Sequence, residues 1–156
     1  MRVTLLVVGK TTDKRIESMT DDYKSRLSHY IQFDMQVLPE LRNTKNLTQE
    51  QQKEAEGKMI LASLSAADML VLLDEHGKEY RSMEFADYMQ RLMSAGRNVV
   101  FAVGGPYGFS KAVYERADAK LSLSKMTFSH QMVRLFFVEQ IYRAMTILRN
   151  EPYHHE

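Results

Sequence analysis

The stretch Val99-Val100-Phe101-Ala102-Val103-Gly104-Gly105-Pro106-Tyr107-Gly108 joins a continuous apolar run to a cluster of glycines. The run is short and entirely apolar, which is typical of a strand buried on both faces of a parallel sheet. Glycines at the carboxyl end of such a strand let a ligand approach the backbone closely. Since open α/β sheets bind ligands outside the carboxyl ends of their strands, this stretch predicts both a fold class and a binding crevice.

The remainder of the chain alternates between strand-like and helix-like periodicity. Strands are predicted over residues 3–8, 33–38, 69–73, 99–103 and near 120–123, with a turn at 74–78. Helices are predicted over residues 13–30, 48–64 with Thr48 as N-cap, 82–95 with Ser82 as cap, 110–116 and 131–149. This order predicts an α/β fold, a mostly parallel sheet with helices on both faces. Residues 1–156 are expected to form a single domain, because no linker or repeat divides them.

Composition excludes several classes of function. The chain has no cysteine, so disulfides, thiolate catalysis and Cys-ligated metals are excluded, and the histidines have no metal-ligand spacing. A net charge of +1 argues against an autonomous RNA-binding module, although an RNA enzyme could concentrate its charge locally. The apolar run at residues 3–8 is too short for a signal peptide or a membrane span, so we expect a cytoplasmic protein without membrane attachment.

The last predicted helix is apolar around most of its circumference. At about 100° per residue, only a sector through Gln131, Glu139, Arg143, Thr146 and Arg149 is clearly polar. A helix of this kind is buried on more than one side. We expect the second side to contact another subunit in a homodimer, and the alternative is a central helix of a monomer.

Arg134 lies inside the apolar sector of this helix, with His130 one turn before it. A guanidinium is rarely buried without a partner. If Arg134 has a purely structural role, its partner would be an acid such as Glu139 or Asp74, in a buried ion pair. Because both side chains closely follow the polar stretch at residues 122–128, we expect instead that they lie beside a cofactor site.

The ordered set of motifs resembles the RlmH family, bacterial methyltransferases of the SPOUT superfamily. The motifs are Val7-Val8-Gly9-Lys10, Leu72-Leu73-Asp74-Glu75-His76-Gly77-Lys78, Gly104-Gly105-Pro106-Tyr107-Gly108, Leu121 to Arg134, Glu139 to Ala144 and Pro152-Tyr153-His154. They span essentially the whole chain. The sequence departs from the family at Ser129, where proline is usual, and in the tail, where Glu151 precedes Pro152 and His155 follows His154.

The resemblance implies an α/β fold with a carboxyl-terminal trefoil knot, and a homodimer that binds S-adenosylmethionine in the knot. It implies methylation at N3 of a pseudouridine in 23S ribosomal RNA, on the assembled ribosome. The family's cofactor contacts fall on Leu73, Gly104, Leu123, Ser124, Lys125, Met126, Thr127 and Phe128. Leu73 would end the central strand, Gly104 would open the glycine turn, and residues 123–128 would wrap the cofactor.

The chemistry of such a transfer points to a small set of catalytic candidates. Methyl transfer from a sulfonium is an in-line displacement, so catalysis is mainly orientation of the reactants. An imide nitrogen is a weak acid and needs a base or a stabiliser for its anion. Histidine titrates near neutral pH, so His130 is the first candidate, and Arg134 could stabilise the anion or hold a phosphate. Tyr142 and His154 are further candidates.

Other α/β enzymes are excluded by missing motifs. The glycine cluster is not G-x-G-x-x-G, no Gly-Lys-Ser/Thr follows it, and the chain has no G-x-S-x-G. The alternative that remains is a non-catalytic, ribosome-associated binding factor with a SPOUT-like fold. Retention of S-adenosylmethionine by the purified protein would separate the enzyme from such a factor.

Overall fold

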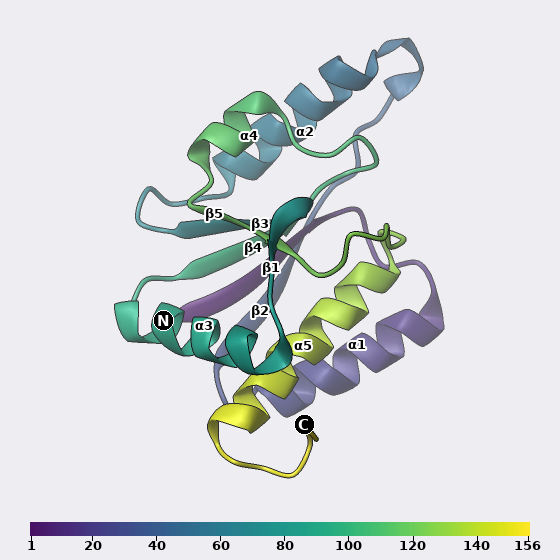
Figure 1. Cartoon of the computed structure of the whole chain (residues 1–156). Helices are drawn as coiled ribbons and strands as arrows, with labels where there is room; N and C mark the ends of the chain where they lie inside the picture. The colour runs from purple at the N-terminus through teal and green to yellow at the C-terminus, as the bar shows by residue number, and fades with distance from the viewer.

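The computed structural model describes residues 1–156, built around a five-stranded sheet whose neighbouring strands are all parallel, in the order β2-β1-β4-β3-β5. The elements are β1 (Arg2–Val8), α1 (Lys14–Leu27), β2 (Gln32–Leu38), the short 3-10 helix η1 (Thr44–Asn46), α2 (Gln49–Ala62), β3 (Met69–Glu79), α3 (Ser82–Ala95), β4 (Val99–Val103), α4 (Lys111–Arg116), β5 (Ala119–Ser122) and α5 (Met132–Leu148). Helices α2 and α4 cover one face of the sheet, and α1, α3 and α5 cover the other (Figure 1). The predicted fold class is confirmed.

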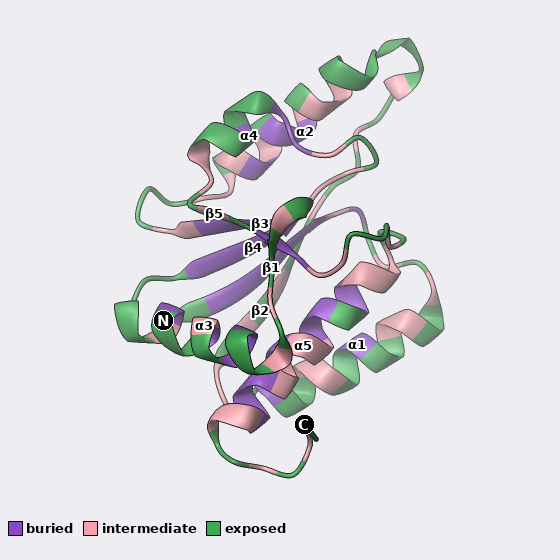
Figure 2. Cartoon of the chain, in the orientation of Figure 1, coloured by how far each residue is buried: buried purple, intermediate pink, exposed green.

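The central strands are apolar because helices cover both faces of the sheet. Every residue of β4 is buried, and so are residues 3–7 of β1, which form the purple centre of Figure 2. The larger core contains Val71, Phe101 and Phe137 and lies under α1, α3 and α5. The smaller core contains Leu70, Leu72 and other side chains between the sheet and the pair α2 and α4.

Helix starts follow the capping residues in most cases. Asp13 accepts a hydrogen bond from the Arg15 N–H, Thr48 forms a reciprocal capping box with Gln51, and Ser110 accepts from Val113. The prediction for α3 was one residue off, because Ser82 is its first residue and Arg81 is the cap. There the Arg81 N–H donates to the Glu84 carboxylate at 2.7 Å.

The prediction of a turn at residues 74–78 is wrong. Strand β3 continues to Glu79, and after an irregularity between Leu73 and Lys78 it pairs again with Leu121 and Ser122 of β5. Gly77 permits this crossing, since a Cβ there would lie 2.7 Å from the Leu121 backbone. The polar residues that resemble a turn are the outward bulge of one long strand.

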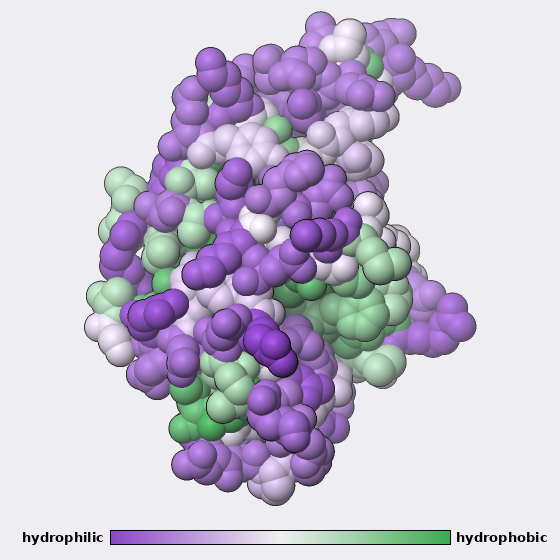
Figure 3. Space-filling view, viewed as in Figure 1, coloured by the Kyte–Doolittle hydropathy of each residue, from purple (hydrophilic) through white to green (hydrophobic).

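The apolar circumference of α5 is covered mainly within one chain. Helices α1 and α3 flank α5 on either side, and the sheet lies beneath it (Figure 1). The second apolar side of this helix, which we expected another subunit to cover, therefore packs largely within the chain. What stays exposed is a smaller patch over the amino-terminal half of α5 and the preceding loop (Figure 3), where Phe136 is 40% exposed and Met126 is 78% exposed. No helix of the chain has both the length and the apolar composition needed to cross a bilayer.

Candidate active site

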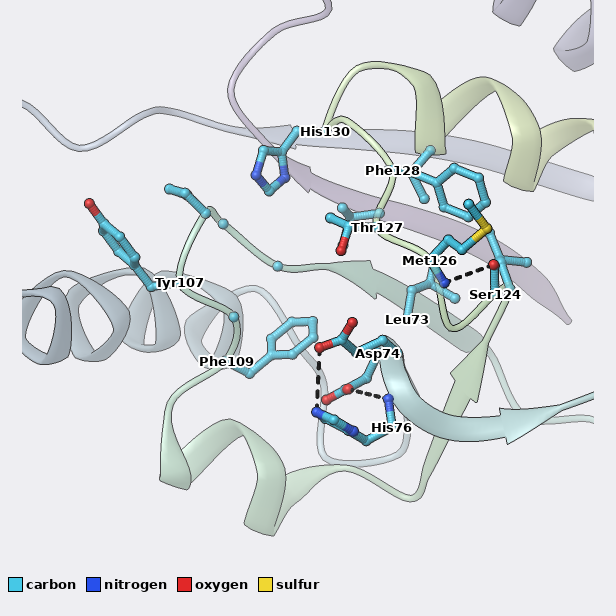
Figure 4. A pocket seen from close by; sticks show the side chains of 18 of the residues that line it. Leu73, Asp74, His76, Tyr107, Phe109, Ser124, Met126, Thr127, Phe128 and His130 are labelled. Carbon is cyan, nitrogen blue, oxygen red and sulfur yellow. Dashed lines mark hydrogen bonds and ion pairs between the residues drawn. The ribbon is translucent and has the colours of Figure 1, made fainter.

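A cavity of about 500 Å³ opens where residues 73–76 of β3 and the carboxyl end of β4 meet the loop after β5. Leu73 was expected to end the central strand, but it lies within β3, which continues to Glu79. Leu73 and Val103 form its floor, and Val133 of α5 closes one side. The remaining walls are Asp74, Glu75, His76, Gly104, Gly105, Pro106, Tyr107, Gly108, Phe109, Tyr114, Leu123, Ser124, Met126, Thr127, Phe128 and His130 (Figure 4). The cavity lies where parallel sheets bind their ligands, as the sequence predicted.

Glycines are needed in the loop after β4 because the neighbouring side chains pack against its backbone. A Cβ on Gly104 would lie 3.2 Å from the Phe109 ring, and one on Gly105 would lie 2.8 Å from Cδ of Glu56, a buried residue of α2. The Gly108 N–H donates to the Gly105 carbonyl at 3.1 Å, and Gly108 has a φ of 84°. The loop is thus a tight turn packed against side chains, with its backbone at the cavity wall.

The loop at residues 123–128 forms the opposite wall. The Ser122 hydroxyl donates to the Ser124 carbonyl at 3.0 Å, and the Met126 N–H donates to the Ser124 hydroxyl at 3.0 Å. Of the residues expected to contact a cofactor, only Lys125 does not line the cavity. Its ammonium lies 3.8 Å from the Glu79 carboxylate instead.

His130 lies at the rim of the cavity, directly before α5 (Figure 4). Its position is fixed by Ser129, whose hydroxyl accepts from the Met132 N–H at 3.1 Å and whose carbonyl accepts from Val133 at 3.0 Å. Ser129 therefore closes the turn that leads into α5, whose N-cap residue is Gln131. A proline at this position has no hydroxyl and could not accept this hydrogen bond from the Met132 N–H.

Arg134 points away from the cavity. Its side chain is 2% exposed and reaches the end of β1, where Nη1 donates to the Gly9 carbonyl at 2.8 Å and Nη2 donates to the Val8 carbonyl at 3.0 Å. Nη1 also contacts the Thr11 hydroxyl at 3.1 Å, and Nε donates to the His130 carbonyl at 3.0 Å. Burial lowers the pKa of the guanidinium, and the carboxylate of Glu40 opposes that shift.

Neither the expectation for Arg134 nor its structural alternative describes what the structure shows. It makes no ion pair with Glu139 or Asp74, because Glu139 pairs with Arg143 and Asp74 accepts from the Tyr114 phenol. It also does not line the cavity, although its neighbours His130 and Val133 do. Strand-end carbonyls carry partial negative charge, and they solvate this buried cation in place of a carboxylate.

Tyr142 and His154 lie outside the cavity of their own chain. Tyr142 is nine residues beyond Val133, about 14 Å along α5, and its ring packs against Tyr23, Tyr30 and Tyr153. The His154 Nδ1 lies 3.1 Å from Arg143 Nη1, and its Nε2 lies 3.1 Å from Glu156. Both belong to a cluster that holds the carboxyl-terminal tail on α1 and α5.

Comparison with known proteins identifies the family. Residues 1–154 match the sequence profile of a family described as "Predicted SPOUT methyltransferase". The chain belongs to this family. A protein of Phocaeicola vulgatus named ribosomal RNA large subunit methyltransferase H is 60% identical over 157 residues, covering 100% of both chains. Proteins of the same name from Bacteroides thetaiotaomicron and Flavobacterium johnsoniae are 60% and 55% identical, again over 100% of both chains.

Sequence reasoning missed one wall of the cavity. The Asp74 carboxylate accepts hydrogen bonds from the Tyr114 phenol and from the His76 N–H, the latter at 2.9 Å. Burial and this bond to Asp74 raise the pKa of the phenol. Tyr107 and Phe109 add aromatic surface beside them. Asp74 could have been found as the first polar residue after the apolar run of β3. Tyr114, on α4, carries no such signal. No three His, Cys, Asp or Glu side chains come together as a metal site.

Proposed function

We propose that this chain transfers a methyl group from S-adenosylmethionine to a base of large-subunit ribosomal RNA. The observation that carries the proposal is the cavity at residues 104–108 and 123–128, in a chain of a methyltransferase family. Relatives that cover the full length of the chain bear the name of a ribosomal RNA methyltransferase. The proposed substrate would place the protein in the cytoplasm.

The cavity fits a nucleoside-sized cofactor. Its volume of about 500 Å³ is within the range of small-molecule sites, roughly 300–1,000 Å³. Leu73, Leu123 and Phe128 would hold the flat base, and the backbone of Gly104 and Thr127 would supply polar contacts. Bound S-adenosylmethionine would supply a methyl group on a sulfonium sulfur. Threading of the segment after β5 as the family's trefoil knot would explain why three separate loops meet here.

For the acceptor we propose N3 of a pseudouridine in 23S ribosomal RNA, presented by the assembled ribosome. His130 is the one catalytic candidate on the cavity rim, and its imidazole would take the N3 proton as the N3–methyl bond forms. The cavity walls would hold the acceptor in line with the methyl group. A net charge of +1 provides few phosphate contacts for tight binding of free RNA, which favours a structured particle as substrate.

We further propose that the active form is a homodimer. The second copy would cover the exposed side chains of Phe136 and Met126 and the half-buried Phe128, which lie beside an apolar groove of about 350 Å³. Tyr142 and His154 are remote from the cavity of their own chain. If they contribute to catalysis, they do so at the cavity of the second subunit.

The test is transfer of labelled methyl groups to ribosomes from cells that lack this protein, with protein-free 23S RNA in parallel. We expect one methyl group per particle, located by mass spectrometry on a pseudouridine, and little transfer to free RNA. His130→Ala should lower kcat by on the order of 10²-fold and leave cofactor affinity unchanged. If the protein retains S-adenosylmethionine but methylates neither substrate, it is a binding factor and the proposal fails.

A further inference from the structure

The loop between β1 and α1 is held unusually firmly against the start of α5. Arg134 donates to the carbonyls of Val8 and Gly9, at 3.0 and 2.8 Å, and to the Thr11 hydroxyl at 3.1 Å. A buried guanidinium spanning two successive carbonyls fixes the direction in which the chain leaves the strand. Gly9, the first residue after β1, has a φ of 81°, a left-handed conformation that favours glycine.

Gln131 fixes the next residues of the same loop from the other side. Its Nε2 donates to the Lys10 carbonyl at 3.2 Å, and its Oε1 accepts from the Thr12 N–H at 2.7 Å. The Gly9 N–H donates to the Leu38 carbonyl at 2.7 Å, which ties the loop to β2 as well. The backbone of Lys10 is thus immobilised on both sides, although its side chain is exposed.

This loop borders the candidate active site. Strands β1 and β4 are parallel neighbours, so the loop after β1 and the glycine loop after β4 lie at the same edge of the sheet. Gln131 directly follows His130 on the cavity rim, and Figure 4 shows the purple end of β1 passing close to His130. Lys10 makes none of the protein's ion pairs, whereas the nearby Lys14 lies 3.8 Å from Glu17. Lys10 therefore carries an exposed, unpaired ammonium on a hydrogen-bonded loop at the same edge of the sheet as the cavity.

We propose that Lys10 binds a phosphate of the RNA next to the target nucleotide, and that Arg134 and Gln131 are positioning residues that hold Lys10 in place. The inference rests on the proposed function, since it assumes an RNA acceptor at this cavity. An ammonium is a compact donor suited to phosphate oxygens, and phosphate contacts set the register of a nucleic acid on a protein. Because the backbone of the loop is ordered in advance, only the lysine side chain loses conformational entropy when the phosphate binds.

The first test compares Lys10→Ala with Lys58→Ala. Lys58 is a matched control, because it is also an exposed lysine but lies on α2, on the face of the sheet away from α1 and α5. Lys10→Ala should raise KM for ribosomes on the order of threefold to tenfold, with kcat and cofactor affinity unchanged. The slope of log KM against log salt should fall by about one. Lys58→Ala should match the wild type. If the two variants behave alike, or if Lys10→Ala lowers kcat alone, Lys10 is not a phosphate contact.

The second test examines the positioning role. Gln131→Ala should raise KM in the same direction as Lys10→Ala, and the double variant should be no worse than Lys10→Ala alone, because both changes remove one contact. Additive losses would refute the coupling. Arg134→Lys keeps the charge but loses the fork across two carbonyls, so it should resemble Gln131→Ala if it folds.

Sedimentation of the protein with ribosomes, in the presence of S-adenosylhomocysteine, measures the phosphate contact without any methyl transfer. If the wild type transfers no methyl group yet binds with a salt slope that Lys10→Ala reduces, the proposed activity fails and the phosphate site stands. Equal slopes for the wild type and Lys10→Ala in an active enzyme would overturn the phosphate site alone.

Discussion

Replacing Gly105 with alanine should disturb the packing of the glycine loop against α2. The new Cβ would lie 2.8 Å from Cδ of Glu56, whereas ordinary contacts begin at 3.4 Å. Glu56 is only 6% exposed, so its carboxylate must rotate among packed neighbours, or α2 and the loop must shift. Over-packing of this kind costs about 1–3 kcal/mol. Alanine also has less conformational entropy than glycine in the unfolded chain, which offsets about 0.4–1 kcal/mol of that cost. The net loss of about 1–2 kcal/mol corresponds to a fall in Tm of about 2–8 °C for a chain of this length.

Thermal unfolding and calorimetry on the same preparations measure the two consequences. Because Gly105 lines the cavity, S-adenosylmethionine should bind up to about tenfold more weakly, the equivalent of about 1.4 kcal/mol. Combining Gly105→Ala with Glu56→Ala provides space for the new methyl group, so the double variant should regain Tm relative to Gly105→Ala. The reasoning is refuted if Gly105→Ala unfolds like the wild type, or if the two losses simply add.

Three further predictions concern the surface, the pH response and the tail. Phe136→Asp should give monomers in analytical ultracentrifugation, because it puts a charge into the exposed patch on α5, whereas Met19→Asp on exposed α1 should not. Burial raises the pKa of Tyr88 to about 12 from its ordinary 10.0, so the folded state holds the phenol proton more tightly, and stability is lost as pH rises through that window. Tyr88→Phe should lessen this alkaline loss in denaturant titrations. Tyr30→Phe removes the phenol that donates to Glu151, so amide exchange at residues 150–156 should quicken while the wild-type core protection is kept.

Most of the fold could be predicted because local pattern and burial agree. The runs at residues 3–8 and 99–103 are apolar on both sides since both faces of the sheet are covered, and Thr48 and Ser110 cap helices that begin where expected. The stretch at 74–78 could not be predicted. Its polar residues favour a turn locally, and only the second pairing with β5, a contact distant in sequence, keeps it extended.

The candidate site could be predicted in its backbone and less well in its side chains. Gly104 and the loop at 123–128 follow strand ends, and parallel strands bring such ends to one edge. The direction of a long side chain depends on what it meets in three dimensions. Helical spacing placed Arg134 on the same sector as His130, yet the carbonyls of Val8 and Gly9, more than a hundred residues earlier, draw the guanidinium away from the cavity.

The buried polar groups around this cavity serve to fix backbone rather than to meet a ligand. Glu56 packs behind Gly105, Ser122 holds the carbonyl of Ser124, and Arg134 holds the end of β1. Each contacts a different one of the three loops that meet at the sheet edge. In-line methyl transfer depends on orientation, and orientation requires walls that are in place before the reactants arrive. Substituting Glu56 or Ser122 should therefore degrade alignment of the reactants, and so kcat, more than substituting an exposed wall residue such as Tyr107. Substituting Arg134 should act through the loop after β1 and raise KM instead.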